Sequence, residues 1–363
     1  MHEYLHICKI CCTFAANFSV MGKRFKLNGN GRQYIAGMEH KLSGNGRQYV
    51  AVIALIVSMI IWSVSGIAIK HALVVLPPFT MIVLRFVPSV LLMLIIGVIC
   101  RNHSLFCLQR MALKDLPLFL IAGFCQPFLY YMLETYAYDA LNSPTIAETL
   151  LSTSPLLSPL FAAVLLRERV TRNNIIGIIV STLGVFVLTL VGAKNYSIGS
   201  YWGVLLAFSA VSAAVIDSVM MRKAPLKYSS LSFVFYTQLI SLCFFLPIWY
   251  FKEGPEAIYN LQFTILSPQG ARLFHNSQVI TALWSVAYLT VFASVIAFIL
   301  FCYALRQIGV TQANAFNNIR PVFTALWMFL FFGEHLPLAK WLGIGLIIFG
   351  LFVCQKKEKV SDC

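Results

Sequence analysis

Long apolar runs constrain this chain more than any other feature of its sequence. Ten of them follow residue 49, each near the roughly 20 residues that a helix needs to cross a bilayer. Only 11% of the residues are charged, against about a quarter in soluble domains, and the runs lack the alternation of outer-membrane strands. The sequence therefore predicts an all-α polytopic membrane protein, with helices at 50–69, 79–100, 116–137, 145–166, 174–192, 199–221, 229–250, 279–303, 312–332 and 338–355.

The distribution of basic residues predicts the orientation of these helices. With the N-terminus inside the cell, 20 Lys and Arg residues lie on the inner side and five on the outer side. Inner loops of membrane proteins carry such an excess, so we expect both termini to be cytoplasmic and the protein to lie in the plasma membrane. The net charge of +14 is then an orientation signal, and the expected partner is the lipid bilayer rather than nucleic acid.

The first 49 residues differ from the rest of the chain. They contain no run of spanning length, and the sequence Gly29–Tyr34 recurs at Gly44–Tyr49. Such a Gly- and Asn-rich basic sequence predicts a flexible cytoplasmic extension, in which Met21 and Met38 are plausible alternative starts. The cluster Cys8–Cys12 lacks a second ligand pair at zinc-finger spacing, so we expect no metal site and no cofactor. Residues 356–363 are expected to form a cytoplasmic tail.

An internal repeat organises the membrane region. The spacing Pro-x12-Glu-x8-Gly-x6-Gly occurs twice, 166 residues apart and without a gap. It predicts two five-helix halves, residues 50–192 and 199–355. Because five is odd, the second half must be inverted relative to the first, an arrangement that many secondary transporters share. The matching pairs are Pro155 and Pro321, Glu168 and Glu334, Gly177 and Gly343, and Gly184 and Gly350.

The sequences that carry the repeat resemble a known family. They are TSPLLSPLFAAVLLRERV at 153–170 and NIRPVFTALWMFLFFGEHL at 318–336, together with IIWSVSGIAIK at 60–70 and Arg85. They are similar to the paired repeats of EamA-type proteins in the drug/metabolite transporter superfamily. The resemblance covers residues 50–355 and implies ten helices and export of small metabolites or amino acids. It also implies alternating access without ATP, in which helices 1, 3, 4, 6, 8 and 9 rock. The basic extension and the outer segment 251–278 depart from the family pattern.

Ionisable side chains inside the apolar runs are candidates for a transport pathway. Burying such a group in a bilayer costs about 2.5–3.5 kcal/mol on insertion scales, so it turns toward a partner or water. Several of these groups also have a purely structural interpretation: Arg85 could pair with Glu134 or Glu148, and Asp217 could bridge to Arg222 at the inner boundary. The five intramembrane groups are Arg85, Glu134, Glu148, Asp217 and Arg320.

Helical spacing places polar groups on one face of the fourth and ninth expected helices. Glu148, Ser152 and Pro155 lie at i, i+4 and i+7, and the repeat relates them to Asn314, Asn318 and Pro321. Trp62 and Tyr130 extend this wall on the first and third helices. We expect the two prolines to act as kinks or hinges, and Glu168 and Glu334 to anchor the membrane boundary. The glycines at 177, 184, 343 and 350 are expected to pack helices closely.

These residues favour a secondary transporter over other classes of membrane protein. No nucleotide-binding P-loop occurs, and all seven histidines lie outside the helix centres, so we expect no enzyme. The expected solute is an amino acid or related metabolite, with Arg85 and Arg320 holding an anionic group and Glu134 or Glu148 binding a coupling proton. An uncoupled exchanger or facilitator, or a non-transporting sensor or channel, is the alternative. The sequence leaves the oligomeric state open.

Overall fold

A computed structural model describes residues 44–100, 107–141, 150–190, 201–224, 227–254, 256, 277–332 and 337–355. All regular elements in this part are helical, and seven of them are long and apolar enough to span a membrane. Two shorter apolar helices are α8 (Ser154–Leu166) and α9 (Arg172–Leu190). The expected extension before residue 44, the tail 356–363, the Cys8–Cys12 cluster, Glu148 and Glu334 lie outside the described residues.

The spanning segments are built from helices with the following bounds. The first half contains α3 (Gly44–Leu73), α4 (Pro78–Ile99), α5 (Leu116–Gly123) and α6 (Tyr130–Ala140) before α8 and α9. The second half contains α10 (Tyr201–Lys223), α11 (Ser230–Lys252), α14 (Ser277–Tyr288), α15 (Ala297–Ile308), α16 (Val310–Ala315), α17 (Arg320–Phe332) and α18 (Leu338–Gln355).

The ninth expected helix, 312–332, is broken rather than continuous. A 3-10 segment, η4 (Phe316–Ile319), separates α16 from α17. Pro321 lies at the second residue of α17, as Pro155 does in α8, where proline is tolerated because the first-turn N–H groups have no partner within the helix. The 166-residue shift that relates the two sequences also carries the bounds of α8 onto those of α17.

Two irregular segments interrupt the third and eighth expected helices. The first, η2 (Phe124–Leu129), is a kink between α5 and α6, because the backbone of Gln126 before Pro127 is extended rather than helical. The second, η3 (Leu289–Ile296), is a π-helical segment that joins α14 to α15. The same 166-residue shift brings them into register. A π segment widens the helix and leaves carbonyl groups that need other donors, and such segments are frequent at functional sites.

The helices α9 and α18 pack backbone against backbone. A Cβ atom added to Gly184 would lie 2.7 Å from the carbonyl oxygen of Gly343, and one added to Gly177 would collide with that of Gly350. The pairing of 177 with 350 and 184 with 343 makes the helices antiparallel. The repeat relates Gly177 to Gly343 and Gly184 to Gly350. Exchanging the two halves of the chain therefore turns each glycine contact into the other, as expected for a contact about a two-fold axis.

The helices α4 and α11 form a second antiparallel pair that is joined by polar contacts at its ends. At the start of α4, the Glu253 carboxylate accepts hydrogen bonds from the backbone N–H groups of Phe79 and Thr80, at 3.2 and 2.7 Å. At the start of α11, the side-chain oxygen of Gln109 accepts one from the backbone N–H of Ser229 at 2.9 Å. The segment that follows each helix therefore satisfies the first turn of the other.

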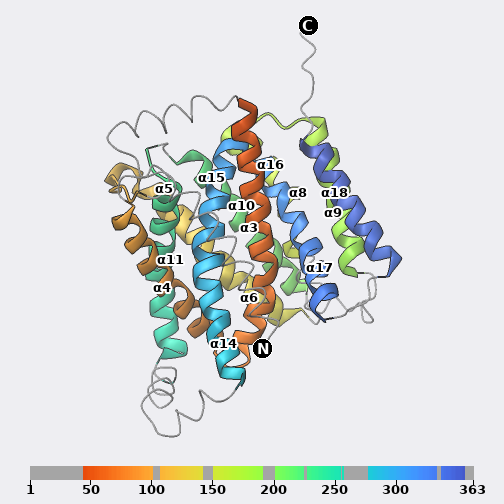
Figure 1. Cartoon of the computed structure of the whole chain (residues 1–363). Helices are drawn as coiled ribbons and strands as arrows, with labels where there is room; N and C mark the ends of the chain where they lie inside the picture. Colours follow the sequence, from red (N-terminus) through yellow and green to blue (C-terminus); the bar gives the residue numbers. More distant parts are fainter. Residues whose placement is uncertain are drawn as a thin grey trace.

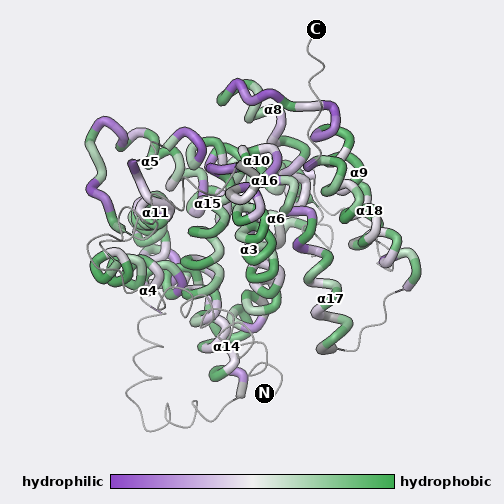
Figure 2. The backbone as a smooth tube through the Cα atoms, turned by 45° about the horizontal axis from the view of Figure 1, so that its top comes forward, coloured by the Kyte–Doolittle hydropathy of each residue, from purple (hydrophilic) through white to green (hydrophobic). Residues whose placement is uncertain are grey.

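The two pairs lie at opposite edges of the bundle, as Figures 1 and 2 show. Between them α3 packs against α14, α15 and α17, and α10 packs against α6, α8 and α16. All of these contacts join the first half of the chain to the second, except that of α10 with α16, which lies within the second half. Hydrophobic residues dominate the helices in Figure 2, and exposed apolar side chains on the outward faces, such as Val98, Ile176 and Phe349, suit a lipid environment.

Candidate functional site

Three of the charges expected inside the membrane act on one aromatic side chain, Tyr131 of α6. Tyr131 contacts the guanidinium of Arg85 of α4 through its ring and lies within electrostatic range of Glu134 and Arg320. Arg320 opens α17, so the group draws on helices from both halves of the chain. The sequence predicts that Tyr131 lies on one polar side of the third expected helix with Tyr130 and Glu134. It does not reveal which other helices converge on Tyr131, because spacing along one helix carries no such information.

Arg85 is the most deeply buried of these charges, with 3% of its surface exposed. Its Nε donates a 2.6 Å hydrogen bond to the hydroxyl of Ser294 in η3. Its guanidinium carbon lies 5.1 Å from the ring centroid of Tyr131 and 5.4 Å from that of Phe86, distances typical of cation–π contacts. Arg85 forms no ion pair with any carboxylate in the described part of the chain.

The π segment η3 supports this arginine from the other side. The carbonyl of Ser294 accepts a 2.6 Å hydrogen bond from Gln238 of α11, and Gln238 in turn accepts one of 2.7 Å from Ser89 of α4. The carbonyl of Ala293 accepts a 3.1 Å hydrogen bond from the indole of Trp62. Side chains from α3 and α11 therefore fill the hydrogen-bonding capacity that the π turn opens. Gln238, an amide in an apolar helix, is a residue that the sequence analysis overlooked.

Glu134 and its neighbours line the same region of α6. The hydroxyl of Tyr130 donates a 3.0 Å hydrogen bond to Glu134, and the rings of Tyr130 and Tyr131 meet edge to face. All three side chains are half-buried rather than fully enclosed. Arginine, carboxylate and tyrosine groups are thus held together where the two halves of the bundle meet.

The asparagines of the ninth expected helix face different neighbours. Asn314 accepts hydrogen bonds from Ser218 of α10 and from Asn317, at 3.4 and 3.2 Å. Asn318 instead donates to Ser181 and to Thr182 of α9, at 2.8 and 3.1 Å. The spacing i, i+4 does not put them on one face because η4 winds with three residues per turn rather than 3.6. Ser152 precedes α8 and is half-buried.

The surroundings of Asp217 differ from those that the sequence predicted. The expected ion pair with Arg222 does not form: Arg222 is exposed and donates to the backbone carbonyl of Arg306. Asp217 is 1% exposed, and its Oδ1 atom is buried without a hydrogen-bond partner. The i, i+5 spacing in a helix explains this, because 500° of rotation turns the two side chains to different faces.

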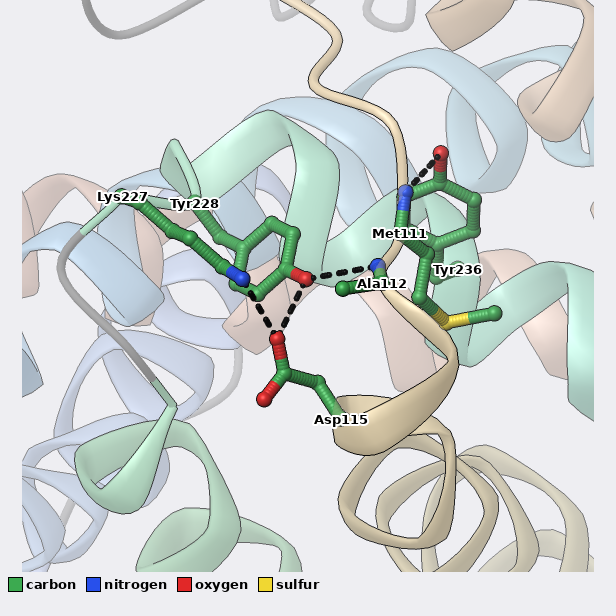
Figure 3. A network of polar contacts seen from close by, with 6 residues as sticks. All are labelled: Met111, Ala112, Asp115, Lys227, Tyr228 and Tyr236. Atoms are coloured by element: carbon green, nitrogen blue, oxygen red, sulfur yellow. Dashed lines mark hydrogen bonds and ion pairs between the residues drawn. The ribbon is translucent and has the colours of Figure 1, made fainter.

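Polar contacts close the end of the bundle at which α3 begins, which we call the inner end after the predicted orientation. Figure 3 shows Asp115 bound by Lys227 at 2.6 Å and by the hydroxyl of Tyr228 at 2.7 Å. The hydrogen bond to Asp115 raises the pKa of Lys227. The same Tyr228 hydroxyl accepts from the backbone N–H of Ala112 at 3.0 Å, and that of Tyr236 accepts from Met111 at 3.2 Å. These bonds join the connection before α5 to the start of α11.

Glu168 completes the inner end. Its Oε1 accepts a 3.1 Å hydrogen bond from the backbone N–H of Val310, and Oε2 accepts from the backbone and hydroxyl of Thr311 at 3.5 and 3.4 Å. A carboxylate at a helix N-terminus is favourable because it satisfies free N–H groups and opposes the helix dipole. The residue expected to anchor the membrane boundary therefore also links α8 of the first half to α16 of the second.

Within the described residues, no group of three or more His, Cys, Asp or Glu side chains could hold a metal ion. The helical bundle, its apolar exterior and the polar cluster at the meeting of its halves define a multi-pass membrane transporter. The model of the EamA-like transporter family matches residues 49–190 and again residues 201–354. The chain belongs to this family.

Curated relatives carry transporter names. "Uncharacterized transporter YetK" of Bacillus subtilis is 25% identical over 86% of this chain and 88% of its own length. "Probable terminal-alkyne amino-acid exporter" of Streptantibioticus cattleyicolor is 25% identical over 69% of this chain and 76% of its own. A solved structure titled "Crystal structure of protein" superimposes with a TM-score of 0.67 at 19% identity, covering 84% of this chain and 96% of that chain, which shows a shared fold. The two curated relatives are named as a transporter and an exporter, not as enzymes.

Proposed function

We propose that this protein is a secondary transporter of the plasma membrane that exports an amino acid or related small metabolite by alternating access. The observation that carries the proposal is the cluster around Tyr131, in which the buried Arg85 has no carboxylate partner among the described side chains. A guanidinium of this kind suits a carboxylate on the solute, and Glu134 suits an ammonium group. The name of the Streptantibioticus relative, an amino-acid exporter, agrees with this solute class.

The proposed architecture is ten crossings in two inverted halves, residues 50–192 and 199–355, with both termini cytoplasmic. The double match of the family model, the 166-residue register of the helices and the antiparallel crossing of α9 and α18 support it. In this arrangement α4, α9, α11 and α18 form the static edges, and the helices between them rock around the solute. The breaks at Pro155 and Pro321 are the proposed hinges.

Purified protein in liposomes tests the proposal directly. The probe is a pool of radiolabelled L-amino acids, and the readouts are saturable uptake and exchange against unlabelled pool. We expect Arg85→Gln to reduce uptake about ten- to a hundred-fold, as loss of a charge-assisted bond worth about 1.5–3 kcal/mol predicts. Arg172→Gln, at the exposed start of α9, is the matched control and should transport normally.

Wild-type uptake equal to that of empty liposomes would contradict this function for amino acids. Normal uptake by Arg85→Gln would remove Arg85 from the solute site. Coupling is tested separately, by asking whether a pH gradient drives accumulation of the labelled pool. A proton-coupled carrier should accumulate it, and an uncoupled exchanger should not. The sequence predicted Glu134 or Glu148 as the residue that binds the coupling proton. Ion currents without solute exchange would indicate a channel.

A further inference from the structure

Asp217 is a buried acidic side chain that does not belong to the proposed solute site around Tyr131. It lies in α10, six residues before the last residue of that helix, which corresponds to about 9 Å of helix. The side chain is 1% exposed, and Oδ1 has no hydrogen-bond partner. Among the described residues, the structure shows no ion pair between Asp217 and a cation, so its charge is not neutralised.

The groups that face Asp217 do not compensate a negative charge. Its thiol neighbours are Cys125 of η2 and Cys302 of α15, which both lie within its electrostatic range. The other elements that pack against α10 are α5, α8 and α16, which carry no ionisable side chain, and α6, whose described acid is Glu134 in the other cluster. The remaining ionisable residues of α6 and α15 are Tyr130, Tyr131, Tyr136, Tyr138, Asp139, Tyr303 and Arg306.

Arg306 is the cation that approaches this part of α10. Its Nε donates a 3.2 Å hydrogen bond to the carbonyl of Met221, one turn after Asp217, and its Nη1 donates one of 2.6 Å to the carbonyl of Tyr228. Its Nη2 is buried without a partner. Arg306 and Asp217 both act on Cys302, yet they form no ion pair in this conformation. A hydrogen-bond donor, Nη2 of Arg306, and an acceptor, Oδ1 of Asp217, are thus both left unsatisfied within electrostatic range of Cys302.

A buried carboxyl group without a counter-ion is stable only when it carries a proton, because desolvation penalises the charged form. We propose that Asp217, rather than Glu134, is the coupling-proton site of this transporter. This inference rests on the proposed transport function. The proton is taken from water on one side of the membrane and bound to the Asp217 carboxylate. It is returned to water on the other side, in the state in which the carboxylate pairs with the free Nη2 of Arg306.

Infrared difference spectroscopy of the full-length protein in liposomes tests the protonation without any solute. Wild-type protein at neutral pH should show the C=O stretch of a protonated carboxyl group in an apolar environment. Asp217→Asn should lose this band, and Glu134→Gln should keep it. A wild-type spectrum without the band, a band that persists in Asp217→Asn, or a band lost in Glu134→Gln would overturn the proposal.

Flux measurements then test coupling, again with the radiolabelled amino-acid pool. Asp217→Asn should exchange labelled for unlabelled pool at a rate within about three-fold of the wild type, but a pH gradient should no longer drive accumulation. Full gradient-driven accumulation by Asp217→Asn would overturn the proposal, as would a wild type that exchanges the pool but ignores the gradient. A wild type that does not exchange the pool would count against the proposed function instead, while the infrared result still decides whether Asp217 holds a proton.

Discussion

The two antiparallel pairs at the edges of the bundle occupy equivalent places but are held together differently. The α9–α18 pair meets through glycine backbones and uncharged side chains such as Asn174, which donates a 2.7 Å hydrogen bond to the carbonyl of Cys354. The α4–α11 pair instead buries a charged side chain, Arg85, together with Ser89 and Gln238. In a bilayer, polar groups away from the ends of a helix are costly and persist where they have a role. The comparison therefore favours a structural role for the first pair and agrees with the proposed solute site beside the second.

The largest effect should follow from a side chain placed in the glycine crossing. Gly177→Leu puts side-chain atoms where the backbone of α18 already lies, so α9 and α18 must separate. We expect little folded protein, or a fall in thermal stability in detergent larger than that of typical overpacking, about 1–3 kcal/mol. Gly345→Leu is the control, because a Cβ at that position meets no atom within 4 Å. Equal stability of the two variants would contradict the proposed packing.

An intermediate effect should follow from removing the amide that joins α4, α11 and η3. Gln238→Leu leaves the carbonyl of Ser294 and the hydroxyl of Ser89 without this partner. A buried unsatisfied group costs about 1–3 kcal/mol, and we expect a stability loss in that range together with reduced transport, because Ser294 also holds Arg85.

The matched control for this amide is Gln307→Leu, which changes an exposed glutamine near the end of α15. Its thermal unfolding and uptake should equal those of the wild type. If Gln238→Leu unfolds at the wild-type temperature and transports normally, the buried polar side chains of the α4–α11 pair support neither stability nor transport. The comparison between the two edges then fails.

The smallest effect should come from the carboxylate that caps α4. Glu253→Gln keeps one acceptor for the N–H groups of Phe79 and Thr80 but removes the charge that opposes the helix dipole. We expect a loss of about 0.3–1 kcal/mol with unchanged transport, measured by thermal unfolding at low salt. Glu256→Gln, an exposed acid just beyond α11, should change neither. A larger loss on Glu256→Gln than on Glu253→Gln would contradict the capping role.

The sequence predicted the parts of this fold that depend on composition and repeat spacing. Pro155 and Pro321 were expected as kinks within helices 145–166 and 312–332, and they lie at the second residues of α8 and α17. The glycines that were expected to pack helices closely lie at the α9–α18 crossing. The π segment η3 and the 3-10 segment η4 were not predicted, because a change in hydrogen-bond register within an apolar helix leaves little trace in hydropathy. The kink in η2 was not predicted either, although Pro127 marks its position in the sequence.

The candidate site was predictable only in part for a related reason. Burial cost identified Arg85, Glu134 and Arg320 as residues that need partners, and the structure places all three around Tyr131. The partners themselves, Ser294 and Gln238, belong to other helices, and pairing across helices depends on rotations that a single sequence does not reveal. Asp217 was assigned to Arg222 from proximity along the helix, which the helical rotation contradicts.

Side-specific thiol labelling of two repeat-related residues tests the inverted arrangement most directly. Arg172 begins α9 and Leu338 begins α18, and the 166-residue shift relates the two positions. In a functional background without the ten native cysteines, an impermeant reagent applied to intact cells should label Leu338→Cys. It should label Arg172→Cys only after the membrane is opened. Labelling of both positions from the same side would show that the halves are parallel and would contradict the account.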